Sequence, residues 1–241
     1  MDPFPYVVID NALPDPIFER LLREFPEQTV IEQGGLYDGH THRFLAESVL
    51  NSEQIPQIWK EFVAFHTSDR CYREAIDFLE PALASCYAER LKFIRRAKTG
   101  IRNVGDGDIM LDCQFVLNRP NVETSRTIHL DNPKELYAML LYVRSPGDTV
   151  KGGDLQIYRA RHGSVGISGV REANPDDLEL IEEVPYAANR LALFLNTPKS
   201  FHGVSVREPG GINRRSMNII AELPKKKSWF GSTSKSEWFH V

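Results

Sequence analysis

The sequence predicts an α+β protein with a mainly β core, because two parts of the chain differ in hydrophobic periodicity. In the first 95 residues, apolar side chains recur at the three- and four-residue spacing of helices. From residue 110 onward, short apolar runs alternate with Pro, Gly and Asn, as in antiparallel sandwiches and barrels. We therefore expect one domain over residues 1–224, with helical support in 1–95 and a β core in 105–224, followed by a tail at 225–241.

The composition is that of an ordinary globular protein. Of the 241 residues, 41% are hydrophobic and 26% are charged, with 16 Gly and 15 Pro, which disfavours collagen-like, coiled-coil and disordered classes. Lys and Arg total 29 against 33 Asp and Glu, so the formal net charge is -4. A chain with this balance has no bulk electrostatic attraction to nucleic acid or to anionic lipid.

The cysteines and the first residues indicate the compartment. Cys71, Cys86 and Cys113 are scattered and odd in number, which argues against a disulfide framework. No basic and apolar leader follows Met1, and no stretch approaches the roughly 18 apolar residues of a membrane-spanning helix. We expect a cytoplasmic protein without a membrane segment.

The helical half begins with a short strand at 6–9 and a helix that opens at Pro14 and ends at Pro26. Ser52 and Ser68 are each expected to cap a further helix. Pro81 is expected to break or kink the second of these, after which a third segment continues to about residue 94.

Seven short apolar runs predict the strands of the β half. They are Met110–Leu117, Leu136–Val143, Asp154–Tyr158, Leu180–Val184, Leu191–Leu195, Phe201–Val206 and Arg214–Ala221. The final stretch, 225–241, is polar with interspersed aromatic residues. We expect it to be a loosely ordered tail, and the alternative is that it packs over the mouth of a site.

A histidine and a carboxylate two residues apart suggest a metal site. In an extended segment His129 and Asp131 point to the same face, so both can bind one ion, and His202 is the natural third ligand. Two histidines and one carboxylate on one side of an ion leave other positions open, which suits non-haem Fe(II). The alternative is that the first two form a surface hydrogen-bonded pair and that His202 is a core histidine.

An arginine in the last predicted strand suggests an anion site. Strand alternation sends Arg214, Ser216 and Asn218 to one face and Arg215, Met217 and Ile219 to the other. A guanidinium inside a barrel requires an anion, and it matches a carboxylate with two parallel hydrogen bonds. Arg215 competes for this role, but Arg214 shares its face with a serine that can add a third hydrogen bond. The alternative is that Arg214 is half of a buried ion pair.

Taken in order, these motifs resemble the prolyl-hydroxylase-like branch of the 2-oxoglutarate- and Fe(II)-dependent oxygenases. The resemblance rests on His129–Pro133, Met139–Val143, Gly152–Leu155, Arg190–Phe194, His202 and Arg214-x-Ser216. It implies a double-stranded β-helix, or jelly roll, in which His129, Asp131 and His202 are the catalytic metal ligands for Fe(II). It also implies that Arg214 and Ser216 bind the distal carboxylate of the co-substrate 2-oxoglutarate. The implied reaction with O2 is hydroxylation of an unactivated C–H bond, with release of succinate and CO2.

The sequence departs from this family where related enzymes place a co-substrate tyrosine on the strand before the His-x-Asp motif. Gln114 and Asn118 occupy that strand here and become the candidates for this contact. The sequence leaves the substrate open among small molecules, amino acids and peptidyl groups, because selectivity resides in loops. It gives no indication of oligomeric state.

Several other interpretations stay open. The same fold without turnover would make a metal- or dicarboxylate-binding sensor. A loop at 31–46 either contacts substrate through Tyr37, His40, His42 and Arg43 or is simply solvated, and its His40-x-His42 spacing with Glu47 weakly resembles a cupin metal motif. Short basic runs at 95–98 and 225–227 allow nucleic-acid modification, but such runs are usually solvated faces, and we expect no nucleic-acid partner.

Overall fold

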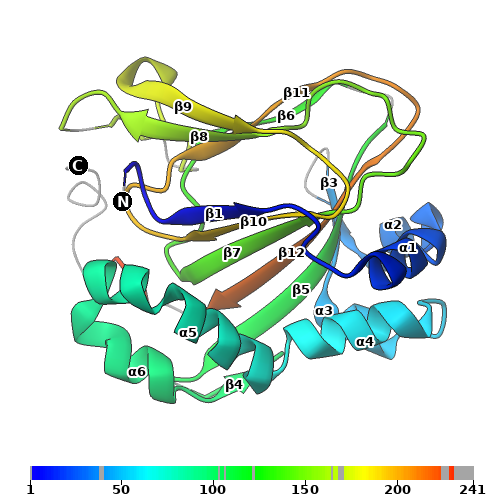
Figure 1. The fold of residues 1–241 in the computed structure, drawn as a ribbon, viewed down its shortest axis with the longest axis horizontal. Helices are drawn as coiled ribbons and strands as arrows, with labels where there is room; N and C mark the ends of the chain where they lie inside the picture. The colour runs from blue at the N-terminus through cyan, green and yellow to red at the C-terminus, as the bar shows by residue number, and fades with distance from the viewer. Residues whose placement is uncertain are drawn as a thin grey trace.

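Two antiparallel sheets face each other, and helices cover the outer face of the larger one (Figure 1). The computed structural model describes residues 2–37, 41–102, 104–105, 107–120, 123–163, 165–167, 171–223 and 228–230. Figure 1 shows the smaller sheet at the top, the larger sheet across the middle, and the helices below it and to its right. The arrangement is that of a β sandwich with a helical layer on one side.

The larger sheet has eight strands in the order β1-β10-β7-β12-β5-β3-β2, with β4 paired to β5. Its strands are β1 (Tyr6–Ile9), β2 (Leu36–Tyr37), β3 (Thr41–Phe44), β4 (Thr99–Gly100), β5 (Ile109–Asn118), β7 (Glu135–Tyr142), β10 (Arg190–Leu195) and β12 (Arg214–Glu222). The smaller sheet has the order β6-β11-β8-β9. Its strands are β6 (Thr124–His129), β8 (Leu155–Ala160), β9 (Leu178–Val184) and β11 (His202–Arg207).

From β5 to β12 the chain passes back and forth between the two sheets, except at the antiparallel pair of β8 and β9. This alternation is the double-stranded β-helix, which confirms the predicted fold class. All seven predicted strands form, with bounds within a few residues of those expected. No apolar run marks β6 in the sequence, because its residues from Thr124 to Thr127 are polar.

The helical layer differs from the prediction at two points. Its α-helices are α1 (Asp15–Arg23), α2 (Gln28–Gly34), α3 (Ala46–Asn51), α4 (Gln57–His66), α5 (Asp69–Cys86) and α6 (Leu91–Arg96), and short 3-10 turns occupy η1 (Ala88–Arg90) and η2 (Pro175–Asp177). Ser68 caps α5 as predicted, since its hydroxyl accepts the Cys71 N–H at 3.2 Å. Ser52 instead follows the end of α3, and α4 begins after Pro56. Pro81 does not break the helix, because α5 continues through the proline with Ala82 and Leu83 buried against the core. The expected third segment from residue 82 to about 94 is instead the end of α5, η1 and α6.

The helices and the larger sheet share one hydrophobic core. Alternate residues of β5, including Cys113, Phe115 and Leu117, face the helices, where Phe115 lies 4.8 Å from the Trp59 ring. The opposite face of the sheet packs against the smaller sheet through a second cluster that includes Tyr142. The helical support and the β core bury side chains in common, which favours the predicted single domain. None of the helices in the described ranges has the length and apolar character needed to cross a bilayer.

The segment predicted as a loop at 31–46 contains regular structure. It includes the end of α2 and an antiparallel hairpin of β2 and β3, in which Leu36 pairs with Arg43 and Tyr37 with His42. In turn, β3 pairs with β5 and extends the larger sheet. Two strands of two and four residues are too short to show a period of two, so the sequence pattern did not reveal them. His40 lies outside the described residues.

Three residues of the segment predicted as a tail, 228–230, contact the folded core. Trp229 is 2% exposed and packs into the core that the helices share with the larger sheet. Its backbone N–H donates to the Pro133 carbonyl at 2.8 Å, and its indole N–H donates to the Lys134 carbonyl at 2.6 Å. Residues 228–230 therefore belong to the folded domain, because a buried indole ring stabilises this segment.

Gly152→Ala is expected to destabilise the fold. At Gly152 the backbone φ is +79°, and an added Cβ would lie 1.8 Å from the Val206 carbonyl oxygen. The two backbone segments would therefore have to move apart. We expect the free energy of unfolding to fall by more than about 2 kcal/mol, measured by chemical denaturation. Gly147→Ala is the matched control, because a Cβ there meets nothing within 4 Å, and a loss of similar size in both variants would contradict the argument.

Candidate metal centre

Strand ends bring the three predicted ligands together. His129 ends β6 and His202 begins β11, and the register pairs the two residues directly. Asp131 follows two residues after His129, with Oδ1 3.6 Å from His129 Nε2 and Oδ2 3.5 Å from His202 Nε2. One ligand atom from each residue lies within 4.8 Å of the others. The structure therefore places these side chains where one ion could contact all three.

The backbone fixes the orientation of both imidazole rings. His129 Nδ1 lies 2.7 Å from the Thr127 carbonyl, and His202 Nδ1 lies 2.8 Å from the Ser200 carbonyl. Because a carbonyl oxygen only accepts hydrogen bonds, each Nδ1 carries the proton and each Nε2 keeps its lone pair for a metal. The sequence analysis did not identify these two partners.

The electrostatics of the cluster favour an ionised carboxylate. Burial lowers the pKa of His129, and the nearby His202 lowers it further. Burial also opposes the charged form of His202, but the Asp131 carboxylate outweighs this effect and raises the pKa of that histidine. Burial alone would raise the pKa of Asp131, yet the two imidazoles hold it well below its usual value. A divalent ion would supply the positive charge that this carboxylate requires.

The donor set and its surroundings fit a mononuclear transition metal. The cluster offers two imidazole nitrogens and one carboxylate oxygen, and three protein donors would leave other coordination positions of a metal open. The two histidine side chains are 8% and 6% exposed, whereas the Asp131 side chain is 21% exposed, so the cluster opens on the carboxylate side. The Phe194 ring lies 4.7 Å from the His202 ring and forms an apolar wall.

A buried guanidinium occupies the same inter-sheet space. Arg214 is 6% exposed, its Nε donates to the Gly153 carbonyl at 2.8 Å, and its guanidinium lies 5.0 Å from the Tyr142 ring centre. Within the described part of the chain, no Asp or Glu oxygen lies within 4.0 Å of this guanidinium. The structure therefore does not support the alternative of a protein ion pair at Arg214 and leaves its charge available to an anionic ligand.

Tyr142 adds a hydrogen-bonding group to the same space, although no role was predicted for it from the sequence. Register pairs Tyr142 with Ser216, so both side chains share the inner face with Arg214. The Tyr142 hydroxyl is buried and has no hydrogen-bond partner among the described residues. A buried hydroxyl without a partner is costly, which suggests that a ligand supplies the missing partner. Only the register between β7 and β12 reveals this contact.

Gln114 and Asn118 also lie on the inner face, opposite Asn218 and Arg214 respectively. Both amides have protein partners. The Gln114 amide donates to Asp112 at 2.8 Å, and its carbonyl oxygen lies 3.5 Å from an Arg43 nitrogen. The Asn118 amide donates to the Thr41 hydroxyl at 3.0 Å. Their expected contact with a co-substrate stays a prediction.

The β2–β3 hairpin places the predicted substrate contacts on two different faces of the larger sheet. Arg43 pairs with Val116, so it shares the inner face with Gln114. By strand alternation Tyr37 and His42 lie on the other face, and His42 Nε2 is 3.9 Å from a Glu32 oxygen in α2. Glu47 contacts Arg102. Among the described residues, the His129 cluster is the only group with metal-binding spacing, and the cupin-like motif stays untested because its His40 lies outside them.

Glu135 is a further titratable group near the cluster, and no motif in the sequence pointed to it. A tight turn brings its backbone N–H to the Asn132 carbonyl at 2.8 Å, immediately after the metal motif. Burial raises the pKa of Glu135 well above its usual value, and the Asp131 and Glu222 carboxylates raise it further, against the opposing charges of Arg171 and Arg43. Burial and the neighbouring carboxylates therefore favour the neutral form of Glu135 beside the candidate metal ligands.

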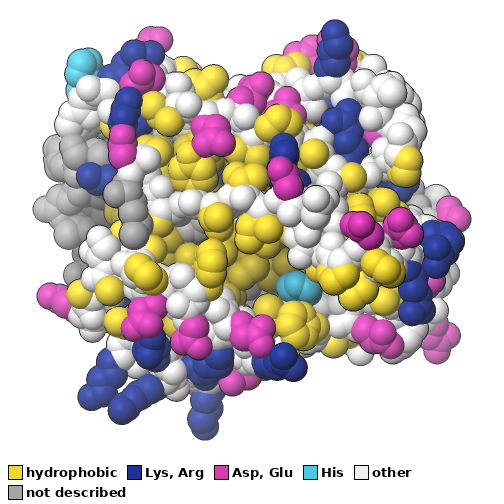
Figure 2. All heavy atoms as spheres, in the orientation of Figure 1, with side chains coloured by type: hydrophobic (Ala, Val, Ile, Leu, Met, Phe, Trp, Pro, Cys, Tyr) yellow, Lys and Arg dark blue, Asp and Glu magenta, His cyan; other side chains and the backbone are white. Residues whose placement is uncertain are grey.

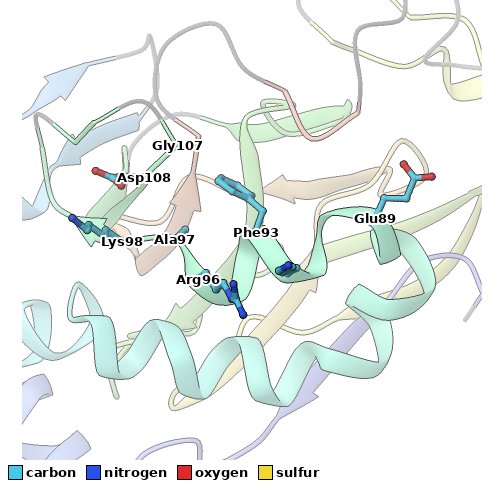
Figure 3. A pocket seen from close by; sticks show the side chains of 8 residues that line it. Glu89, Phe93, Arg96, Ala97, Lys98, Gly107 and Asp108 are labelled. Atoms are coloured by element: carbon cyan, nitrogen blue, oxygen red, sulfur yellow. The ribbon is translucent and has the colours of Figure 1, made fainter.

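The basic run at 95–98 borders a hollow of about 510 Å³ beside α6 (Figure 3). The hollow is lined by Glu89, Lys92, Phe93, Arg96, Ala97, Lys98, Gly107 and Asp108. Arg95 forms an ion pair with Glu80 at 2.5 Å. Figure 2 shows Lys and Arg side chains interspersed with Asp and Glu along the lower edge of the molecule, around an apolar centre. The run at 225–227 lies outside the described residues.

Fold and site together define a double-stranded β-helix protein with a candidate mononuclear metal centre of two histidines and one carboxylate. Comparison with known proteins found no matching family model and no matching curated sequence. Solved structures with a similar fold include a Phytophthora capsici prolyl 4-hydroxylase, at 17% identity and a TM-score of 0.51. The alignment covers 92% of this chain but only 60% of that one.

Two further solved structures are similar over most of both chains. A Pseudomonas putida prolyl-4-hydroxylase has 15% identity, covers 92% of this chain and 95% of its own, and gives a TM-score of 0.43. A viral collagen prolyl hydroxylase from Paramecium bursaria Chlorella virus-1 has 12% identity, 93% and 98% coverage, and a TM-score of 0.46. At these identities the likeness concerns the fold, and this chain shares its fold with the Phytophthora enzyme.

Proposed function

We propose that this protein is an Fe(II)- and 2-oxoglutarate-dependent dioxygenase that hydroxylates an unactivated C–H bond and releases succinate and CO2. The observation that supports the proposal most is the convergence of three candidate metal ligands and a buried guanidinium between the same two sheets; among the described residues this guanidinium has no carboxylate partner. Bound iron together with 2-oxoglutarate would supply the activation of O2 and the oxidation of the C–H bond. The substrate class proposed is a small molecule, an amino acid or a peptidyl group.

The residues of this chain would hold and orient the reactants. His129, Asp131 and His202 would bind iron from one side, with both ring tautomers set by backbone carbonyls. Arg214 would bind the distal carboxylate of 2-oxoglutarate through its fork of N–H groups, and the Tyr142 and Ser216 hydroxyls share its face. The apolar ring of Phe194 would exclude water from one side of the metal. Gln114 and Asn118, on the adjacent strand β5, are the proposed polar contacts to 2-oxoglutarate.

The second candidate is a non-catalytic protein that senses the metal or a dicarboxylate with the same groups. A dicarboxylate sensor predicts the same binding equilibria as the oxygenase, because both would use the same ligands and the same arginine. Only turnover separates them.

Succinate formation from 2-oxoglutarate tests the proposal. Protein loaded anaerobically with Fe(II) and then given O2 is expected to convert 2-oxoglutarate to succinate and CO2, even slowly without substrate. Mass spectrometry quantifies succinate, and protein loaded with Zn(II) is the control. Binding of both metal and 2-oxoglutarate without succinate formation would favour the sensor. If metal-loaded protein does not bind 2-oxoglutarate, the oxygenase and the dicarboxylate sensor are both wrong, and only a metal sensor remains.

A further inference from the structure

Three guanidinium groups surround one tyrosine ring beyond the proposed co-substrate site. The guanidinium carbons of Arg144, Arg207 and Arg214 lie 5.2, 5.4 and 4.9 Å from the centre of the Tyr186 ring. Like charges this close repel each other, and Arg207 and Arg214 are 2% and 6% exposed. The cluster therefore needs compensation from within the protein or from a ligand.

Asp148 pairs with two of the three guanidinium groups. Its side chain is fully buried, and both of its carboxylate oxygens accept hydrogen bonds from Arg207 Nη2 at 2.8 Å. Arg144 Nε lies 3.7 Å from one of these oxygens. Because Asp148 is committed to these partners, it does not pair with Arg214. The third charge is the one that the proposed function assigns to the co-substrate.

The same ion pair holds the turn that contacts Arg214. Arg207 Nη1 donates to the Val150 carbonyl at 3.2 Å, and an Asp148 oxygen accepts the Val150 N–H at 3.1 Å. Three residues later, the Gly153 carbonyl accepts the hydrogen bond from Arg214 Nε. Gly153 has a φ of +82°, and a Cβ there would lie 2.9 Å from Arg214 Cδ, so the turn touches the arginine along its side chain.

We propose that Asp148 and Arg207 are positioning residues for Arg214. They hold the turn so that the Gly153 carbonyl fixes one side of the guanidinium, and they leave its remaining N–H groups and its charge to a 2-oxo dicarboxylate. The inference rests on the proposed function, because it assigns Arg214 to the distal carboxylate. It predicts a defect confined to ligands that possess such a carboxylate.

A comparison of two ligands tests this inference by binding rather than turnover. Oxalate can chelate the metal through two adjacent oxygens, but unlike 2-oxoglutarate it has no distal carboxylate. Isothermal titration of Mn(II)-loaded protein measures the Kd for each ligand. Arg207→Met is expected to weaken 2-oxoglutarate binding by about tenfold or more and to leave oxalate binding within about twofold. Arg207→Lys should restore part of the loss, since it keeps the charge without the fork.

Two more variants keep the test decisive. If Arg207→Met does not fold, Gly153→Ala displaces Arg214 from the other end of the same contact and should show the same selective loss. Leu21→Ala, which removes a buried side chain on the helical side, is the destabilised control and should not change the ratio of the two affinities. Equal losses for both ligands, or no loss, would overturn the inference alone. Failure of the wild-type protein to bind 2-oxoglutarate while it binds oxalate would overturn the proposed function with it.

Discussion

His129→Ala and Asp131→Ala are each expected to abolish Fe(II)-dependent succinate formation. Each substitution leaves only two of the three ligand atoms that lie within 4.8 Å of one another. Loss of a group that merely orients a ligand costs about 10–100-fold in metal affinity or activity, so loss of the ligand itself should cost more than about 100-fold. Equilibrium dialysis of Mn(II) measures the affinity, and succinate formation measures turnover.

The expected loss must be distinguished from loss of folding. Asp131 is partly exposed, and the hydrophobic clusters do not include it, so Asp131→Ala should retain a cooperative thermal transition. His162→Ala is the matched control, because this exposed histidine lies outside the cluster and should bind metal like the wild type. Metal content and turnover that stay at the wild-type level in Asp131→Ala would show that the ligand assignment is wrong.

The sequence was sufficient to predict those features that one residue type or one hydrophobic period determines. The seven predicted strands formed because their apolar runs bury against a sheet neighbour. Arg214 and Ser216 are two residues apart, and both lie on the inner face as predicted. Side chains alternate between the two faces of a strand whichever strands pair with it. The His-x-Asp spacing likewise predicted a cluster whose third member, His202, is brought in by the register of β6 and β11.

The rest of the site depends on contacts between distant segments. Tyr142 faces Ser216 only because β7 pairs with β12 in one particular register. Thr127 and Ser200 contribute backbone carbonyls, and a backbone group leaves no mark in the sequence. Asp148 and Arg207 are 59 residues apart and meet in a buried pair that neither local pattern suggests. These contacts depend on how the two sheets assemble, which no local sequence pattern reveals.

Arg214→Met is expected to raise the KM for 2-oxoglutarate by about 100-fold, which corresponds to roughly 2.7 kcal/mol of lost binding. A guanidinium and a carboxylate in a water-poor site form charge-assisted hydrogen bonds worth about 1.5–3 kcal/mol each, and methionine keeps much of the volume without the charge. Turnover at saturating co-substrate should fall less, since the metal ligands are intact. The KM of Arg214→Lys should lie between those of the wild type and Arg214→Met, because an ammonium keeps the charge but cannot form two parallel hydrogen bonds.

Arg215→Met is the matched control because the two arginines are neighbours that face opposite sides of the same sheet. The Arg215 guanidinium lies 4.4 Å from the Phe25 ring centre on the helical side, away from the inter-sheet space. Its loss should lower the free energy of unfolding by about 0.5–1 kcal/mol through the lost cation–π contact and leave the KM for 2-oxoglutarate unchanged. Steady-state kinetics and chemical denaturation on both variants separate the two roles. A rise in KM in Arg215→Met, with Arg214→Met unaffected, would mean that the anion binds on the other face and that the proposed co-substrate site is misplaced.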